Sequence, residues 1–147
     1  MDELLQMLEL SSQGFHCSQI LILMGLGAQG KKNDDLVRAM QGLGGGIGFC
    51  GDVCGSLTGG ACLLALYAGR ALPEEEDDPR LNLMISDLHE WFSNEFAGCY
   101  GGINCSTILD DHPENQKLRC PTIVTKTYEK VKSLLDSNGF DMSESKL

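Results

Sequence analysis

Residues 42–69 read GLGGGIGFCGDVCGSLTGGACLLALYAG, and we expect this segment to form the centre of the fold. Its first part, residues 42–48, is mostly glycine and predicts a turn or a very closely packed segment, because glycine adopts conformations that other residues avoid. Its second part, residues 51–69, is rich in alanine, leucine and cysteine and predicts a buried helix. The glycines recur every three or four residues at positions 44, 48, 51, 55 and 59. This spacing would let the segment approach neighbouring backbones closely.

The sequence on either side predicts further helices and no strands. Apolar residues recur at helical spacing over residues 4–24, with Gly14 dividing them into two helices. Asn33 is a plausible cap for a helix over residues 34–40. Pro79 would begin a helix that continues to residue 96, and Pro121 would open the last helix, which Gly139 ends. We therefore predict an all-α fold, a compact bundle of about five to six helices around a glycine-rich central segment.

Length and composition indicate one globular domain. A chain of 147 residues can bury a sufficient core without disulfides, and we find no internal repeat and no domain linker. Residues 1–147 are thus expected to form a single cysteine-motif domain, with residues 141–147 as a flexible polar tail.

Charge and hydropathy argue against several classes of partner. The formal net charge is −10 and the basic residues are scattered, so nucleic acid is not expected as a partner. The longest apolar stretch, residues 61–68, is far shorter than the roughly 20 residues of a membrane-spanning helix, so we expect a protein that is not membrane-embedded. The N-terminus is acidic where a secretory signal is basic, which favours a cytoplasmic location. The acidic surface suits a basic partner protein, and the glycine-rich face suits a homodimer.

Seven cysteines make sulfur chemistry the first candidate for function. In a reducing cytosol stable disulfides are rare, so such cysteines are metal ligands, redox thiols or small buried hydrophobes. An odd number also leaves at least one cysteine without an intramolecular partner. The chain has no Cys-x-x-Cys motif, which argues against a zinc ribbon, a thioredoxin-like site and a haem attachment motif. Any site must therefore be assembled by the tertiary fold.

The glycine segment does not fit a nucleotide-binding motif. A dinucleotide fingerprint requires glycine at its first, third and sixth positions, whereas the sixth position is Ile47 or Phe49, depending on the starting glycine. Close packing is the simplest interpretation. The functional alternative is that bare backbone leaves room and N–H groups for an inorganic cluster or a small anionic ligand.

The cysteine pattern resembles that of a family of redox-active proteins named C-GCAxxG-C-C. The resemblance rests on Phe15-His16-Cys17-Ser18-Gln19, residues 42–48, Val53-Cys54-Gly55-Ser56-Leu57-Thr58-Gly59, Asn104-Cys105 and Cys120. It covers the chain from Phe15 to about Leu135, and Ser56 stands where the family usually has alanine. The resemblance implies that Cys17, Cys54, Cys105 and Cys120 are the functional cysteines. It also implies a redox partner protein, associated with transport.

Four thiols that converge from separate helices can support three kinds of chemistry. Our leading hypothesis is electron transfer through an iron–sulfur cluster held by Cys17, Cys54, Cys105 and Cys120, with backbone at Gly55 close to the cluster sulfur. The first alternative is thiol–disulfide exchange by the same cysteines. The second is an accessory module that binds a single metal ion such as zinc without turnover.

The other cysteines and His16 have simpler interpretations. Cys62 lies among alanine and leucine and is expected to be a buried hydrophobe. Cys50 and Cys99 lie beside glycines; we expect packing roles first, and a resolving thiol or an alternative ligand second. If residues 50–62 were helical, Cys50, Cys54 and Cys62 would lie on roughly one face. His16 is expected to be a surface or capping residue.

Overall fold

The computed structural model describes residues 2–146, and within this range the chain is all-α. The helices are α1 (Glu3–Ser12), α2 (Cys17–Ala28), α3 (Asp34–Met40), α4 (Gly55–Ala68), α5 (Pro79–Phe92), α6 (Gly98–Tyr100), α7 (Cys105–Leu109) and α8 (Gln116–Ser137). A π-helical turn, Ser93–Ala97, joins α5 to α6, and 3₁₀ turns lie at Gln41–Leu43 and Pro113–Asn115. The β pairing of the described residues is limited to one isolated antiparallel bridge, Val53 with Asn104.

The predicted all-α class is confirmed, but five to six helices is too few. Helix α7 was not predicted, because a helix of five residues is too short for a hydrophobic period to be recognised. Predicted boundaries at Gly14 and Asn33 are confirmed: Gly14 has a φ of 95°, and the Asn33 side chain accepts the Leu36 N–H at 3.1 Å. Gly139, with a φ of 84°, follows the end of α8 as expected.

Two predicted helix starts are wrong. Helix α4 begins at Gly55 rather than near residue 51, because Gly51 has a φ of 76° and Val53 pairs with another segment. Cys50 and Cys54 therefore do not share a helix face. Helix α8 begins at Gln116, so Pro121 lies inside it instead of opening it. A proline near the start of a helix removes one backbone hydrogen bond, and this helix continues through it.

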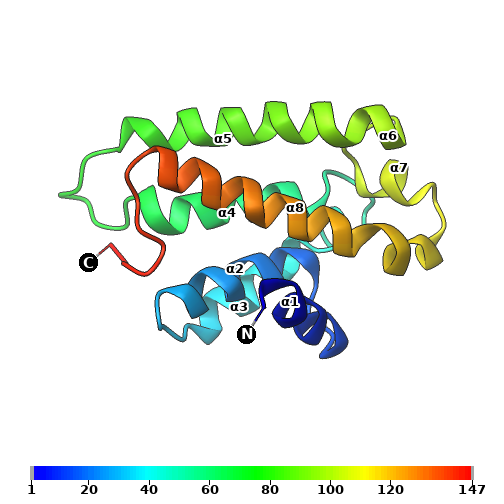
Figure 1. Ribbon diagram of the computed structural model, residues 1–147, viewed down its shortest axis with the longest axis horizontal. Helices are drawn as coiled ribbons and strands as arrows, with labels where there is room; N and C mark the ends of the chain where they lie inside the picture. Colours follow the sequence, from blue (N-terminus) through cyan, green and yellow to red (C-terminus); the bar gives the residue numbers. More distant parts are fainter. Residues whose placement is uncertain (1, 147) are drawn as a thin grey trace.

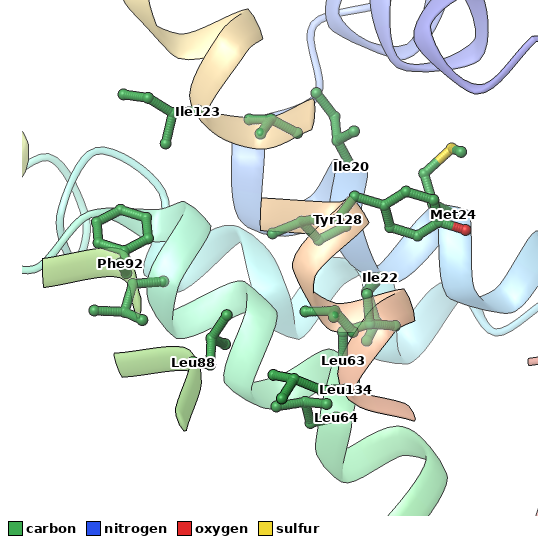
Figure 2. Close-up of a cluster of buried hydrophobic side chains, with 14 of the residues drawn as sticks. Ile20, Ile22, Met24, Leu63, Leu64, Leu88, Phe92, Ile123, Tyr128 and Leu134 are labelled. Atoms are coloured by element: carbon green, nitrogen blue, oxygen red, sulfur yellow. The ribbon is translucent and has the colours of Figure 1, made fainter. Parts of the chain in front are cut away.

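Helix α4 lies at the centre of the bundle. Together with α8 it is flanked by α5 on one side and by α2 on the other, with α1 and α3 beyond α2 (Figure 1). Leu63 and Leu64 of α4 are fully buried among apolar side chains of the neighbouring helices. Figure 2 shows them with Ile20, Ile22 and Met24 of α2, Leu88 and Phe92 of α5, and Ile123, Tyr128 and Leu134 of α8.

Glycines allow α2 and α4 to pack unusually close together. A Cβ atom added at Gly59 would lie 2.8 Å from the backbone Cα of Ser18, and one added at Gly25 would overlap the Leu63 side chain. Real Cβ contacts are longer than this, because carbon atoms prefer separations of about 3.5–4.0 Å. The close packing predicted from the glycine spacing therefore occurs between these helices. It brings the first turns of α2 and α4 side by side.

The segment expected to be a flexible tail contacts the bundle over residues 141–146, while residue 147 lies outside the described residues. The Tyr67 hydroxyl donates to the Met142 carbonyl at 2.9 Å, and Lys146 Nζ lies 3.2 Å from a Glu75 carboxylate oxygen. These contacts hold the segment against α4 and the loop after it. Across residues 2–146, no helix combines the length and apolar character needed to cross a membrane.

Candidate functional site

The four cysteines of the sequence pattern line one cavity of about 350 Å³. The cavity lies where α2, α4 and α7 begin. Its wall also includes Gly55, His16, Phe49 and a fifth cysteine, Cys50. The tertiary fold therefore brings together the residues that the sequence analysis singled out, although they are up to about a hundred positions apart in the chain.

The bridge between Val53 and Asn104 brings two of the cysteines together. The Cys54 N–H donates to the Ile103 carbonyl at 2.9 Å, and the Cys105 N–H donates to the Asp52 carbonyl at 2.7 Å. Each cysteine follows directly after one arm of the bridge, and each stands at the start of a helix. Because these bonds join residues about 50 positions apart, local sequence patterns do not reveal this convergence.

Three of the four cysteines occupy helix N-termini. Cys17 is the first residue of α2, Cys54 is the residue that caps α4, and Cys105 is the first residue of α7. The N-terminus of a helix carries partial positive charge and unpaired N–H groups, so it favours a nearby thiolate. The effect is greatest for α2 and α4, which have 12 and 14 residues, and least for the single short helix α7.

Cys17 and Cys54 form a hydrogen-bonded pair of thiols. Cys54 is 6% exposed and Cys17 is half-buried. The hydrogen bond from Cys17 lowers the pKa of Cys54 to about 7, against an opposing effect of burial. The backbone N–H groups of Ser56 and Leu57 and the Ser56 hydroxyl lower this pKa further. Cys54 is thus the thiol of the site that ionises most readily.

The three other thiols of the pattern are held in the protonated form. The hydrogen bond to Cys54 raises the pKa of Cys17 well above its ordinary value, and burial adds to this. Burial and the charge of Cys54 raise the pKa of Cys105. Burial raises the pKa of Cys120 to about 12, with smaller contributions from the charges of Cys54 and Cys105. Near neutral pH the site therefore combines one thiolate with thiols that can donate a proton.

Gly55 leaves the space beside Cys54 that the Cys17 sulfur occupies. A Cβ atom at this position would lie 2.8 Å from Cys17 Sγ and 3.0 Å from the Leu43 carbonyl oxygen. Any larger residue would displace the Cys17 sulfur. Gly55 was expected to give a cofactor access to the backbone; in the structure it lies against the Cys17 thiol.

The loop before α4 has a left-handed backbone. Gly45, Gly46 and Gly48 have positive φ angles, and so do Ile47 (62°) and Phe49 (64°). Left-handed backbone costs about 1–2 kcal/mol for each residue that has a Cβ atom. Backbone hydrogen bonds hold the loop, among them Gly48 N–H to the Gly42 carbonyl at 2.9 Å. The Phe49 ring packs edge-on against the His16 ring, with centroids 5.1 Å apart, at the rim of the cavity.

Among residues 2–146, no three side chains of histidine, cysteine, aspartate or glutamate lie where they could hold one ion together. The donor chemistry is nevertheless that of iron–sulfur proteins, because four thiols face one cavity beside helix N-termini that offer backbone N–H groups. Cys17, Cys54, Cys105 and Cys120 would be the ligands of such a cluster.

The remaining cysteines differ from the expectations in part. Cys62 is half-buried and packs against the core, and burial raises its pKa. Cys50 and Cys99 are exposed, so the packing role expected first does not hold for either. His16 caps α2 as expected: its N–H donates to Gln19 Oε1 at 3.1 Å.

Ser56 is a residue of the site whose contribution the sequence analysis missed. Its side chain is 1% exposed and its hydroxyl hydrogen-bonds both Cys54 and Cys17. The available signal was the serine itself, which stands beside Cys54 in a motif that resembles one with alanine. Serine and alanine are similar in size, but a hydroxyl beside a sulfur also alters the electrostatics.

Comparisons with known proteins identify one family. Its model, described as "Putative redox-active protein (C_GCAxxG_C_C)", matches residues 15–134 and so includes all four cysteines of the pattern. No curated protein and no solved structure matches the chain at the level of significance applied.

Proposed function

Because this chain belongs to the C_GCAxxG_C_C family of redox-active proteins, we propose that it carries out thiol–disulfide exchange through Cys17 and Cys54. The observation that supports this proposal most strongly is the hydrogen bond between the two thiols, which lowers the pKa of Cys54 and raises that of Cys17. Exchange requires one thiolate as nucleophile and one nearby thiol that completes the reaction. The pair meets both requirements.

The reaction proceeds in two steps. The Cys54 thiolate attacks one sulfur of a partner disulfide, RS–SR′, so that a bond forms between Cys54 and RS while R′S⁻ leaves and takes up a proton from water. Cys17 then attacks Cys54 Sγ, its proton passes to the departing RS⁻, and a disulfide joins Cys17 to Cys54. The protein has lost two electrons and the proton of Cys17, and the partner, which took its other proton from water, has become two thiols. The reverse sequence oxidises a partner dithiol.

Cys105 and Cys120 have a secondary role in this proposal. Both line the cavity beside Cys54, and the charge of Cys54 contributes to the raised pKa of each. Their raised pKa values make them poor nucleophiles at neutral pH, because the thiolate is the reactive form. We assign them as a second dithiol. The Cys17–Cys54 disulfide oxidises this dithiol by the same exchange reaction.

An iron–sulfur cluster is the second candidate, supported by the placement of four thiols around one cavity. Cys17, Cys54, Cys105 and Cys120 would hold it, and the cluster would supply one-electron transfer when bound. The protein's own contribution would be the N–H groups of α2 and α4, which hydrogen-bond anionic sulfur. For either function we propose a redox protein as the partner, one that is associated with transport. We also propose that the protein forms a homodimer.

The test begins with protein purified without oxygen. Iron, sulfide and zinc are quantified and a UV–visible spectrum is recorded, and the protein is then equilibrated with mixtures of reduced and oxidised glutathione. Peptide mapping identifies the disulfides that form. Cys54→Ser is compared with Cys62→Ser, a control in which a half-buried cysteine outside the cavity lining is changed.

Exchange chemistry predicts a colourless protein that loses thiols in pairs and yields a Cys17–Cys54 cross-linked peptide. Cys62→Ser should behave like the wild type, and Cys54→Ser should form no such link. Stoichiometric iron and sulfide, with a charge-transfer absorption that Cys54→Ser abolishes, would instead refute exchange and establish the cluster.

A further inference from the structure

Cys50 differs from the other cysteines of the cavity because it is exposed. It lines the same cavity as Cys17, Cys54 and Cys105, but these are buried or half-buried. The family's cysteine pattern does not include it. Cys54, at 6% exposure, is poorly accessible to a sulfur carried by a folded or extended polypeptide. A thiol at the mouth of the cavity is better placed to meet such a partner.

The loop that carries Cys50 also exposes two apolar side chains. Ile47 is 48% exposed and Phe49 is 64% exposed. Both have positive φ angles, a conformation that glycine adopts more easily. The backbone hydrogen bond from Asp52 N–H to the Gly46 carbonyl, at 3.0 Å, helps to fix the loop in this form. Exposed apolar residues beside an exposed thiol are suited to contact with an extended polypeptide.

The carboxyl end of the loop is fixed to α7. The Gly51 carbonyl accepts hydrogen bonds from both the N–H and the hydroxyl of Ser106, at 3.2 and 2.9 Å. Ser106 follows Cys105 directly, so this attachment keeps Cys50 next to the cavity. The loop therefore combines an outward apolar face with a fixed position beside the buried thiols.

We propose that Cys50 is the exchange thiol through which disulfide-bearing polypeptides react with the Cys17–Cys54 pair, and that Ile47 and Phe49 contact the polypeptide. The inference rests on the thiol–disulfide function proposed above. Small disulfides reach Cys54 through the cavity and do not need Cys50. The protein thus distinguishes its substrates by size.

The exchange adds one step to the reaction. The Cys50 thiolate attacks a polypeptide disulfide, RS–SR′, forming a bond between Cys50 and RS and releasing R′S⁻, which takes up a proton. Cys54 attacks the Cys50 sulfur and releases RS⁻, which takes up a proton from water, leaving a disulfide between Cys50 and Cys54. Cys17 then attacks Cys54, and Cys50 recovers a proton as its thiol. Two electrons pass from Cys17 and Cys54 to the polypeptide disulfide, and Cys50 is regenerated.

Two probes with the same leaving group test this inference. One is 2-mercaptoethanol carrying a 2-thiopyridyl disulfide, and the other is an unstructured peptide of apolar and aromatic residues whose single cysteine carries the same group. The reduced protein is mixed with each probe, and the rate of formation of the Cys17–Cys54 linked peptide is measured by mass spectrometry. Cys50→Ser is compared with Cys99→Ser, because both cysteines are exposed but Cys99 does not line the cavity.

We expect Cys50→Ser to slow oxidation by the peptide at least about tenfold while changing oxidation by the small probe less than about twofold, because exchange rates depend on access to the attacking thiol. Cys99→Ser should match the wild type with both probes. Phe49→Gly, which suits the positive φ at this position, should slow the reaction with the peptide more than the reaction with the small probe.

Three outcomes would count against the inference, and they are distinguishable. An unchanged peptide rate in Cys50→Ser removes Cys50 from the path and leaves the Cys17–Cys54 function intact. An equal loss of rate with both probes in Cys50→Ser shows that Cys50 affects the reactivity of Cys17 and Cys54 themselves and not the access of substrates to them. A wild type in which neither probe produces the Cys17–Cys54 link refutes the proposed function, and the inference with it.

Discussion

Replacing Gly55 with alanine should uncouple Cys17 from Cys54. The added Cβ atom would lie 2.8 Å from Cys17 Sγ, whereas non-bonded heavy atoms prefer about 3.5–4.0 Å, so the sulfur has to move by about 1 Å. A displacement of this size weakens the hydrogen bond that contributes most to the lowered pKa of Cys54. Hydrogen bonds to charged groups contribute about 1.5–3 kcal/mol, and one pKa unit corresponds to about 1.4 kcal/mol. We therefore expect the pKa of Cys54 to rise by about one unit.

The consequence appears as a shift in the pH dependence of alkylation. Iodoacetamide reacts with the thiolate, so the rate at Cys54 rises with pH through the pKa of about 7. An increase of one unit reduces the thiolate fraction at pH 7 from about one half to about one tenth, and thus slows alkylation about fivefold. Above pH 9 the variant and the wild type should react at nearly equal rates. Rates at Cys54 are measured by mass spectrometry of the labelled peptide.

Gly27→Ala is the matched control, because Gly27 also lies in a helix and an added Cβ atom there has no neighbour within 4 Å. This variant should keep the wild-type pH profile and gain up to about 1 kcal/mol of helix stability. If Gly55→Ala also retains the wild-type profile while remaining folded, the hydrogen bond from Cys17 is not what lowers the pKa of Cys54.

Two further predictions follow from the same region. Ser56→Ala should raise the pKa of Cys54 by less than Gly55→Ala does, because the Ser56 hydroxyl lowers this pKa less than Cys17 does. The pH dependence of alkylation at Cys54 measures the change. An unchanged pH dependence would exclude a role for the hydroxyl. Gly59→Ala should reduce the free energy of unfolding by about 1–3 kcal/mol, because the added Cβ atom would lie 2.8 Å from the Ser18 backbone. Urea denaturation of this variant and of Gly27→Ala measures the loss. Equal stability of the two variants would contradict tight packing of α2 against α4.

Much of the helical framework was predictable because local signals define it. Gly14, Asn33 and Gly139 act on the backbone within a few residues, and each ends or caps a helix where the sequence predicts. The spacing of glycines also predicted the close packing at Gly59. Local signals failed at Pro121, because the preceding 3₁₀ turn starts the helix earlier than the proline would.

The candidate site was predictable only through the resemblance. It indicated which cysteines matter, but the pairing of Cys17 with Cys54 depends on contacts between distant segments. The bridge of Val53 with Asn104 and the packing of α2 on α4 have no local sequence signal. The loop at Ile47 and Phe49 was also unpredictable, because branched and aromatic residues normally avoid a positive φ. The exposure of Cys50 was also unpredictable, because no local sequence signal indicates that the loop turns outward.

The position of Cys17 and Cys54 on two packed helices links thermal stability to reduction potential. A bond between them would close a loop of nearly 40 residues, and cross-links of this span remove about 4 kcal/mol of conformational entropy from the unfolded chain. By the thermodynamic cycle, the same free energy appears as a reduction potential about 80 mV below that of the pair in an unfolded chain. Melting curves recorded in buffers of graded redox potential would therefore measure the reduction potential of the Cys17–Cys54 pair.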